Sequence, residues 1–364
     1  MSYKSIDEIQ NYLSDNYFSR TNDARKASGR ALGTIVEIIT YYWLKENNFL
    51  QNLSIETHLS EYGNKNLTHN VEFTLHKILS NTNNISLDPK ENISVGKIIK
   101  SNNLSEFKNK KSGRLLTFDN KTIIKNGLCI GEKENSFILS YVNTENFTYR
   151  ITELDNTAIA MFECKRVGKE GNSKGPQTIE KAKQGAYVAK TVSSLQKVIS
   201  SNGEIKGIYF DKNNNYHIES YDSLIEKHIN KIINIKDFIL TIGIVSNHGN
   251  WFTNDNKNKE LEVLCNSYDW LLFLSDNGLA EFINDIFSIG ECLDAFKYSY
   301  TKESNSIKKN PNIFTKSNID YYADKKLTEY FHNNIEKINK WFNVLNKNNK
   351  SINDLVSELK KLSE

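Results

Sequence analysis

The sequence predicts a mixed α/β fold, in which helical segments at both ends of the chain flank a region rich in strands. Residues 22 to 46, and most of the chain beyond residue 260, carry apolar side chains three or four positions apart, which is the spacing of helices. Between them, short apolar or alternating runs are separated by Asn and Gly, which is typical of strands and turns. The 364 residues suffice for one large domain or two modest ones.

Composition and cysteine spacing exclude several classes of protein. Hydrophobic residues make up 38% and charged residues 25% of the chain, which fits a soluble globular protein. No apolar run approaches the roughly 18 residues of a membrane span, and the start MSYKSIDEIQNYL lacks the basic and apolar regions of a signal peptide. The four cysteines lie far apart without the CxxC spacing of a zinc site. We therefore expect a cytoplasmic protein with no membrane partner.

A short helix is predicted at residues 5 to 15, and the long helix at residues 22 to 46 follows it. In the long helix, Arg30, Gly33, Glu37 and Tyr41 fall on one line at helical spacing. Glu37 therefore lies among largely apolar residues, where burying an unpaired carboxylate costs free energy. It is either one half of a surface ion pair with Arg30 or a member of a functional site.

Strand candidates dominate residues 49 to 154. They are residues 70 to 78, 93 to 99, 115 to 118, 122 to 130, 137 to 142 and 147 to 154. The first of them, NVEFTLHKI, contains Glu72 as a lone acid in an apolar strand pattern. Burying a carboxylate costs free energy unless it is paired, so Glu72 also implies a partner.

The next predicted strand, residues 157 to 166, contains the pattern Glu-x-Lys. Glu163 and Lys165 are two positions apart in an otherwise apolar run, so both side chains project from the same face of the strand. Gly175-Pro176 then begins a predicted helix that extends to about residue 199. A hairpin at residues 205 to 220 and a strand at residues 238 to 246 follow.

This order of a strand with Glu-x-Lys, a loop and a helix resembles the second half of the PD-(D/E)XK nuclease core, which most type II restriction endonucleases and several repair nucleases share. The resemblance implies a restriction-endonuclease-like αβββαβ core with a β-rich insertion and a helical C-terminal part. It divides the chain into core helices, an insertion that carries DNA-reading loops, a catalytic core and a helical C-terminal region. These four parts are residues 1 to 48, 49 to 154, 155 to 250 and 251 to 364.

The resemblance calls for one more acid before Glu-x-Lys, and the sequence leaves it open. Asp155 and Glu153 lie eight and ten residues before Glu163. Eight residues of unbroken strand span roughly 26 Å, so Asp155 can approach Glu163 only if the chain turns back near Asp155 to Thr157. Choosing Glu72 instead requires an insertion of about ninety residues. Asp119 is a weaker third candidate because it resembles a turn residue. Asp155 and Glu72 both remain candidates.

The resemblance also implies the chemistry. Mg²⁺ would be held by Glu163, by Asp155 or Glu72, by the backbone carbonyl of Cys164 and, as in several restriction enzymes of this family, by Glu37. Lys165 would orient or deprotonate the attacking water and offset charge on the phosphate. We expect a type II site-specific deoxyribonuclease of a restriction-modification system. The alternatives are a repair or recombination nuclease and a non-catalytic DNA-binding protein with a decayed nuclease core.

Double-stranded DNA is the expected partner, although a net charge of +3 is too small to indicate it alone. Candidate DNA contacts are Arg30, Arg114, Arg166, Lys169, Lys174, Lys181 and, facing the active site from the helix, Gln184. Chance placement and simple solvation are the alternative readings of these cations. A homodimer is expected because cutting both strands of a palindrome needs two active sites related by a two-fold axis. Heavy use of Asn, Lys and Ile indicates an AT-rich bacterial or phage source.

Overall fold

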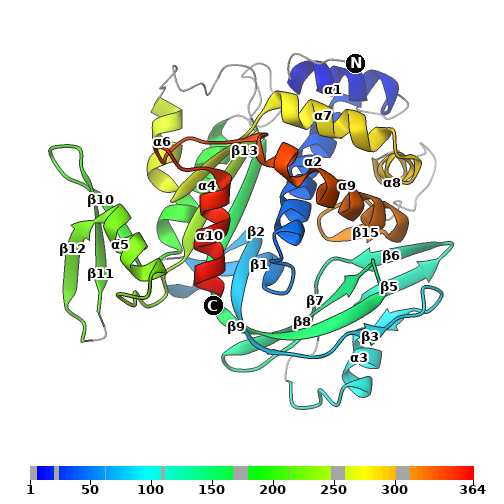
Figure 1. Ribbon diagram of the computed structural model, residues 1–364, viewed down its shortest axis with the longest axis horizontal. Helices are drawn as coiled ribbons and strands as arrows, with labels where there is room; N and C mark the ends of the chain where they lie inside the picture. Colours follow the sequence, from blue (N-terminus) through cyan, green and yellow to red (C-terminus); the bar gives the residue numbers. More distant parts are fainter. Residues whose placement is uncertain are drawn as a thin grey trace.

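The computed structural model describes residues 6–19, 24–61, 63–107, 111–166, 179–211, 213–246, 259–300 and 312–364. Within these ranges the chain forms ten helices and three sheets in a mixed α/β arrangement (Figure 1). None of the helices in the described ranges is long and apolar enough to cross a membrane.

A nine-stranded sheet organises the molecule. Its main path contains, in order, β1 (Leu53–Glu61), β2 (Asn64–Asn81), β9 (Thr148–Arg166), β13 (Leu240–Ser246), β14 (Trp270–Leu274) and β16 (Phe342–Val344). The pairs β1–β2 and β2–β9 are antiparallel, whereas β9–β13 and β13–β14 are parallel. Strand β16 closes this edge antiparallel to β14. The sheet is therefore mixed, with its parallel strands in the middle.

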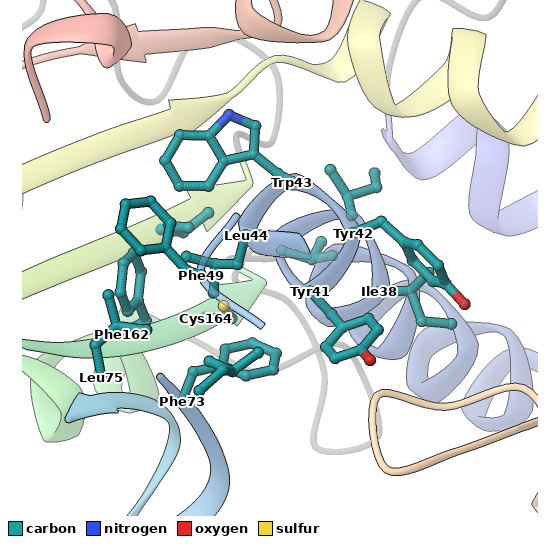
Figure 2. Close-up of a cluster of buried hydrophobic side chains, with 14 of the residues drawn as sticks. Ile38, Tyr41, Tyr42, Trp43, Leu44, Phe49, Phe73, Leu75, Phe162 and Cys164 are labelled. Carbon is teal, nitrogen blue, oxygen red and sulfur yellow. The ribbon is translucent and has the colours of Figure 1, made fainter. Parts of the chain in front are cut away.

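Helices cover both faces of the parallel strands. The aromatic and aliphatic side chains of α2 (Ala24–Glu46) pack with Phe73, Leu75 and Phe162 on one face (Figure 2). On the other face, Ala186 and Ala189 of α4 (Ile179–Thr191) pack with the side chains next along the strands, such as Met161. Helix α6 (Lys259–Ser267) shares this second layer. Because neighbouring residues of a strand point to opposite faces, two covered faces require nearly continuous apolar runs, as in β13.

Smaller sheets and the remaining helices surround this core. Strands β3 (Ile85–Ser86), β7 (Leu128–Glu132) and β8 (Ser136–Asn143) extend the main sheet along the first half of β9. A four-stranded sheet contains β4 (Ile93–Ser94), β5 (Arg114–Asp119), β6 (Lys121–Lys125) and β15 (Asn318–Asp320). A three-stranded sheet contains β10 (Gln196–Ile199), β11 (Ile205–Phe210) and β12 (Tyr216–Ser220). The remaining helices are α1 (Ile6–Asn16), α3 (Val95–Ser101), α5 (Tyr221–Ile229), α7 (Asp276–Phe287), α8 (Gly290–Tyr300), α9 (Tyr321–Asn339) and α10 (Ile352–Ser363).

Several elements differ from the sequence-based expectation. The strands expected at residues 147 to 154 and 157 to 166 are one strand, β9. Pairing with β8 continues as far as Asp155, and β2 pairs on both sides of the Asp-Asn pair with an irregular register between Leu154 and Ala160, so the chain stays extended where a turn was favoured. The helix expected to reach residue 199 ends at Thr191, where the three-stranded sheet begins shortly afterwards. Residues 270 to 274, expected to be helical, form β14. The long helix α2, the hairpin and β13 agree with expectation.

The expected division of the chain into four parts also differs from the structure. Strands β1 and β2, assigned to the insertion, belong to the main sheet, and so do β14 and β16 of the C-terminal part. The boundary expected after residue 154 lies inside β9. The physical reason is that sheet pairing joins segments that are distant in the chain, whereas the division followed local patterns.

His76 of β2 predicts a pH dependence of stability. Its Nδ1 donates to the Asp155 carbonyl (2.9 Å) and its Nε2 accepts from the Thr74 hydroxyl (2.8 Å). Burial lowers the pKa of His76 to about 4, against 6.5 in an unfolded chain. The free energy of unfolding should therefore be highest above pH 6.5 and fall, by about 3 kcal/mol, as the pH drops toward 4.

Denaturant unfolding across this pH range measures the effect. In His76→Gln the dependence should be much flatter, although the variant is less stable throughout. Identical pH slopes for the variant and the wild type would contradict the assignment.

Candidate active site

Glu72, Glu163 and Lys165 meet on neighbouring strands of the main sheet. Strands β2 and β9 pair antiparallel with Phe73 opposite Phe162, so the next step of this register places Glu72 beside Glu163. The Lys165 ammonium lies 2.7 Å from Glu72 Oε1 and 2.7 Å from Glu163 Oε2. Two carboxylates from different strands thus share one cation.

Cys164 lies between the two functional positions of β9 but faces the other way. Its thiol donates to the Thr40 hydroxyl of α2 (3.4 Å), on the α2 side of the sheet. Its backbone N–H donates to Glu72 Oε2 (3.2 Å). Because Lys165 donates to the other oxygen of Glu72, both oxygens of this carboxylate are held. The alternation of a strand therefore places Glu163 and Lys165 together and anchors Glu72 from the peptide between them.

The pKa values of the two carboxyl groups shift in opposite directions. Glu163 is only 3% exposed, and burial, together with the charge of Glu72, raises its pKa well above the usual value. Burial also acts to raise the pKa of Glu72, but the hydrogen bond from Glu163 and the charges of Lys165 and Lys316 outweigh it, so this pKa is lowered. Such a pair holds one proton between two oxygens, with Glu163 as its holder.

Lys165 remains an ammonium in this environment. Burial acts to lower its pKa, but the charges of Glu163 and Glu72 outweigh burial and raise it. Its Nζ also contacts Glu163 Oε2 at 2.7 Å, so one ammonium lies against both carboxyl groups.

Two glycines let a tyrosine cover the carboxylates. A Cβ on Gly243 of β13 would lie 2.7 Å from the Tyr268 ring, and one on Gly185 of α4 would lie 2.6 Å from the Tyr268 hydroxyl. The same Gly185 position is 3.7 Å from the Glu163 side chain. Tyr268 is buried, and burial together with Glu163 raises its pKa well above the usual value. Tyr268 therefore forms part of a low-dielectric cover over Glu163 that sequence patterns did not indicate.

A second cluster lies next to the first on the α2 side. Lys316 Nζ is 3.2 Å from Glu37 Oε2 and 2.6 Å from Glu56 Oε1. Asn126 holds the segment in place, since its side chain donates to the Lys316 carbonyl (3.0 Å). Burial raises the pKa of Glu37, Lys316 opposes this, and the charge of Glu72 adds to it. Glu37 is thus within electrostatic reach of the site, and its cation is Lys316 rather than the expected Arg30.

Lys316 was missed because no local signal indicates it. The residue lies in a Lys- and Asn-rich stretch, and its contacts join segments hundreds of residues apart. Its ammonium is buried, with 8% of the side chain exposed, which is unusual for lysine.

Removing Lys316 should destabilise the protein. Lys316→Ala leaves Glu37 partly buried without its cation, and we expect the free energy of unfolding to fall by about 1–3 kcal/mol. Lys326→Ala is the matched control, because the Lys326–Glu329 pair is exposed and should contribute less than about 0.5 kcal/mol. Urea denaturation of both variants measures the difference. If both variants lost the same free energy of unfolding, the buried ion pairs of Lys316 would contribute no more to stability than an exposed pair.

Asp155 is placed away from the carboxylate pair. Strand β9 runs without interruption from Thr148 to Arg166, so Asp155 and Glu163 are separated by eight residues of extended chain, on the order of 25 Å. The turn that Asp155 would have needed is not formed, and its Oδ1 accepts from the Thr157 N–H (2.7 Å). Of the two acids left open, the structure brings Glu72 to Glu163.

The other two acids are also distant in register. Glu153 accepts from the Ser136 hydroxyl (2.7 Å) and pairs with Lys133, on the part of β9 that pairs with β8. Asp119 is exposed at the turn between β5 and β6. Both have local structural roles of the kind that polar residues take at turns and sheet surfaces.

Three of the DNA-contact candidates have described side chains, and all three are exposed. Arg30 on α2 and Arg114 on β5 are exposed. Gln184 on α4 is exposed as well, and it is the adjacent Gly185 that lies against Glu163. Lys169 and Lys174 lie outside the described residues, and so do the side chains of Arg166 and Lys181.

The donor set fits a hard divalent cation such as Mg²⁺. Glu72 and Glu163 offer carboxylate oxygens from two adjacent strands, and oxygen is the ligand atom that Mg²⁺ prefers. In the described ranges, no group of three or more His, Cys, Asp or Glu side chains is placed to hold a metal ion. Two carboxylates completed by carbonyl, water or phosphate oxygens are nevertheless the usual arrangement for Mg²⁺, which retains much of its hydration.

No protein-family model, curated protein or solved structure matches the chain. The chemical interpretation of the site therefore depends on the residues, distances and charges described above.

Proposed function

We propose that this protein is a Mg²⁺-dependent endonuclease that hydrolyses phosphodiester bonds of double-stranded DNA, with the sequence-specific cleavage of a type II restriction enzyme. The observation that carries the proposal is the meeting of Glu72 with Glu163 and Lys165 on adjacent strands. Two acids and a lysine at the expected Glu-x-Lys spacing, all largely buried, have no simple structural purpose, because an apolar trio would cost less.

The order of elements around the site supports the same proposal. Helix α2 is followed by β1, β2 and β9, then by α4 and β13, which is the αβββαβ order that the resemblance implies. These four strands are neighbours in the main sheet. The segments from β3 to β8 and from β10 to α5 interrupt this order as insertions. The ninety residues that separate Glu72 from Glu163 are thus mostly the first insertion.

Each residue has a stated part in the proposed reaction. Glu72, Glu163 and the Cys164 carbonyl would hold Mg²⁺, with Glu37 nearby. The ion, when bound, supplies positive charge to the scissile phosphate and acidifies a bound water. Lys165 is an ammonium, so its part is to orient the attacking water and to stabilise negative charge on the phosphate rather than to accept a proton. Tyr268 and α4 limit access of bulk water to Glu163.

The partners follow from the reaction. Exposed cations such as Arg30 and Arg114 are available to contact phosphates, and binding would weaken as salt rises. Cleavage of both strands at a palindrome would require a homodimer. We place this activity in the bacterial cytoplasm, where restriction enzymes meet DNA.

Incubation with plasmid and phage DNA tests the proposal. We expect discrete fragments with Mg²⁺, none with EDTA, and a loss of at least about 100-fold in Lys165→Ala and Glu163→Ala. Lys190→Ala is the matched control, since this exposed lysine lies on α4 away from the carboxylates and should not affect cleavage.

The other outcomes are informative. Nicking of branched or flapped DNA alone would favour a repair or recombination nuclease, and binding without cleavage would favour a decayed core. Normal cleavage by Lys165→Ala would refute the site even if the protein is a nuclease.

A further inference from the structure

A cavity of about 440 Å³ lies away from the carboxylates, at the other end of the core strands. Its walls come from β2, the middle of β9, the loop between α5 and β13, and the end of α10. In Figure 1 the C-terminal end of α10 lies beside β9, and α10 contacts β2, β9 and α5. The volume is in the range of sites that hold small molecules.

Four lysines line this cavity: one is on β2, two are on the loop between α5 and β13, and one is on α10. They are Lys77, Lys231, Lys236 and Lys361. The first three form no ion pair with any described residue, and Lys361 donates to the Asn230 side chain (2.9 Å). The cavity also contains Asp155 and Asp237, so its four lysines and two carboxylates leave a formal charge of +2 (4 − 2). Gathering like charges opposes folding unless an anion compensates for them.

His228 also lines the cavity, and its ring is held by the neighbouring backbone. Its Nδ1 accepts from the Ile235 N–H (3.1 Å), so the ring hydrogen is on Nε2. The ring packs edge-on against Phe238, with 4.7 Å between centroids. Burial, and then the charge of Lys77, lower the pKa of His228, and a backbone hydrogen bond with Ile233 opposes them.

The floor of the cavity is apolar. Ile229, Ile235, Phe238 and Leu362 are buried side chains that line it. A cavity with an apolar floor and a few convergent polar groups is the usual form of a small-molecule site.

The loop that supplies most of the wall is held in an unfavourable conformation. Lys231 and Asp237 have φ angles of 59° and 55°, in the left-handed region that costs such residues roughly 1 kcal/mol each. Strain of this kind is retained where the surrounding structure, or a function, requires the backbone to take that course.

We propose that this cavity binds a small phosphate-bearing ligand, with the phosphate among Lys77, Lys231 and Lys236 and a planar or apolar body, such as a nucleoside, against the apolar floor. The chemistry is that of a mononucleotide. This site is separate from the carboxylate site and does not depend on the proposed nuclease activity.

Calorimetric titration with four probes in EDTA tests the proposal: AMP, inorganic phosphate, adenosine and a short DNA duplex. We expect AMP to bind, phosphate to bind more weakly, and adenosine not to bind. The double variant Lys77→Ala/Lys236→Ala should weaken AMP binding at least about tenfold, and added salt should weaken it in the wild type. Lys65→Ala, which removes another exposed lysine of β2, is the matched control and should bind normally.

The remaining outcomes decide the question either way. Phosphate binding as tight as that of AMP would support the phosphate site with inorganic phosphate as its occupant. The proposal would be overturned by no binding of AMP or phosphate at about 5 mM, or by equal binding in the double variant. Duplex binding that the double variant loses, without mononucleotide binding, would also overturn it. All four lysines are exposed, so thermal unfolding should confirm that the variants stay folded.

Discussion

Replacing Glu72 with Ala should reduce DNA cleavage by at least about a thousandfold, whereas replacing Asp155 with Ala should leave it within about threefold of the wild type. The sequence left both acids as candidates for the second carboxylate. In the structure Glu72 lies at Glu163 and Lys165, whereas Asp155 lies eight residues from Glu163 along β9. Glu72 accepts from Lys165 and from the Cys164 backbone, so its removal leaves a buried ammonium with one partner fewer and a metal site with a single carboxylate. The Asp155 side chain accepts from the nearby Thr157 N–H.

Rate measurements under single-turnover conditions, with wild type and both variants at equal concentration, compare the two acids directly. Glu72→Gln serves as the isosteric companion, because it keeps the volume of the side chain and removes only the charge. Unfolding curves check that lost cleavage is not lost folding. If Asp155→Ala were folded but inactive, Asp155 would be the second metal-binding acid, and the assignment of Glu72 would be contradicted.

Glu163→Gln should make the protein inactive and more stable at the same time. Burial raises the pKa of Glu163, so folding favours its protonated form. A raised pKa in the folded state contributes stability that is present below the unfolded pKa of about 4.5 and is lost as pH rises through the folded pKa. Gln resembles the protonated carboxyl, and its amide can donate to Glu72 in the same way. It therefore avoids that loss.

We expect a gain of about 1 kcal/mol in the free energy of unfolding at pH 8 and little difference near pH 4. Guanidinium unfolding at the two pH values measures it, and plasmid cleavage should be undetectable because a neutral amide is a poor ligand for Mg²⁺. Gln196→Ala, at an exposed position of β10, is a control for a substitution without either effect. A Glu163→Gln protein that is less stable at pH 8 than the wild type would mean that pairing of the carboxylate with Lys165 outweighs its burial.

Much of the scaffold could be predicted from local patterns. The 3.6-residue period of residues 22 to 46 identified α2, because one face of that helix packs on the sheet. Small residues along α4 predicted its close approach to the strands, and Gly185 beside Glu163 is the extreme case. Where prediction failed, a local preference was overruled. Asp155-Asn156 favours a turn, but backbone pairing with β8 and β2 keeps the chain extended.

The sequence by itself determined that Glu163 and Lys165 lie together on one face of a strand, since a period of two is a property of the backbone alone. Only the tertiary structure decided which other residues surround them. Glu72 arrives from β2 and Lys316 from the C-terminal part, with Tyr268 above them. Strand register and side-chain contacts across hundreds of residues depend on how whole surfaces pack, and short-range patterns contain no information about that packing.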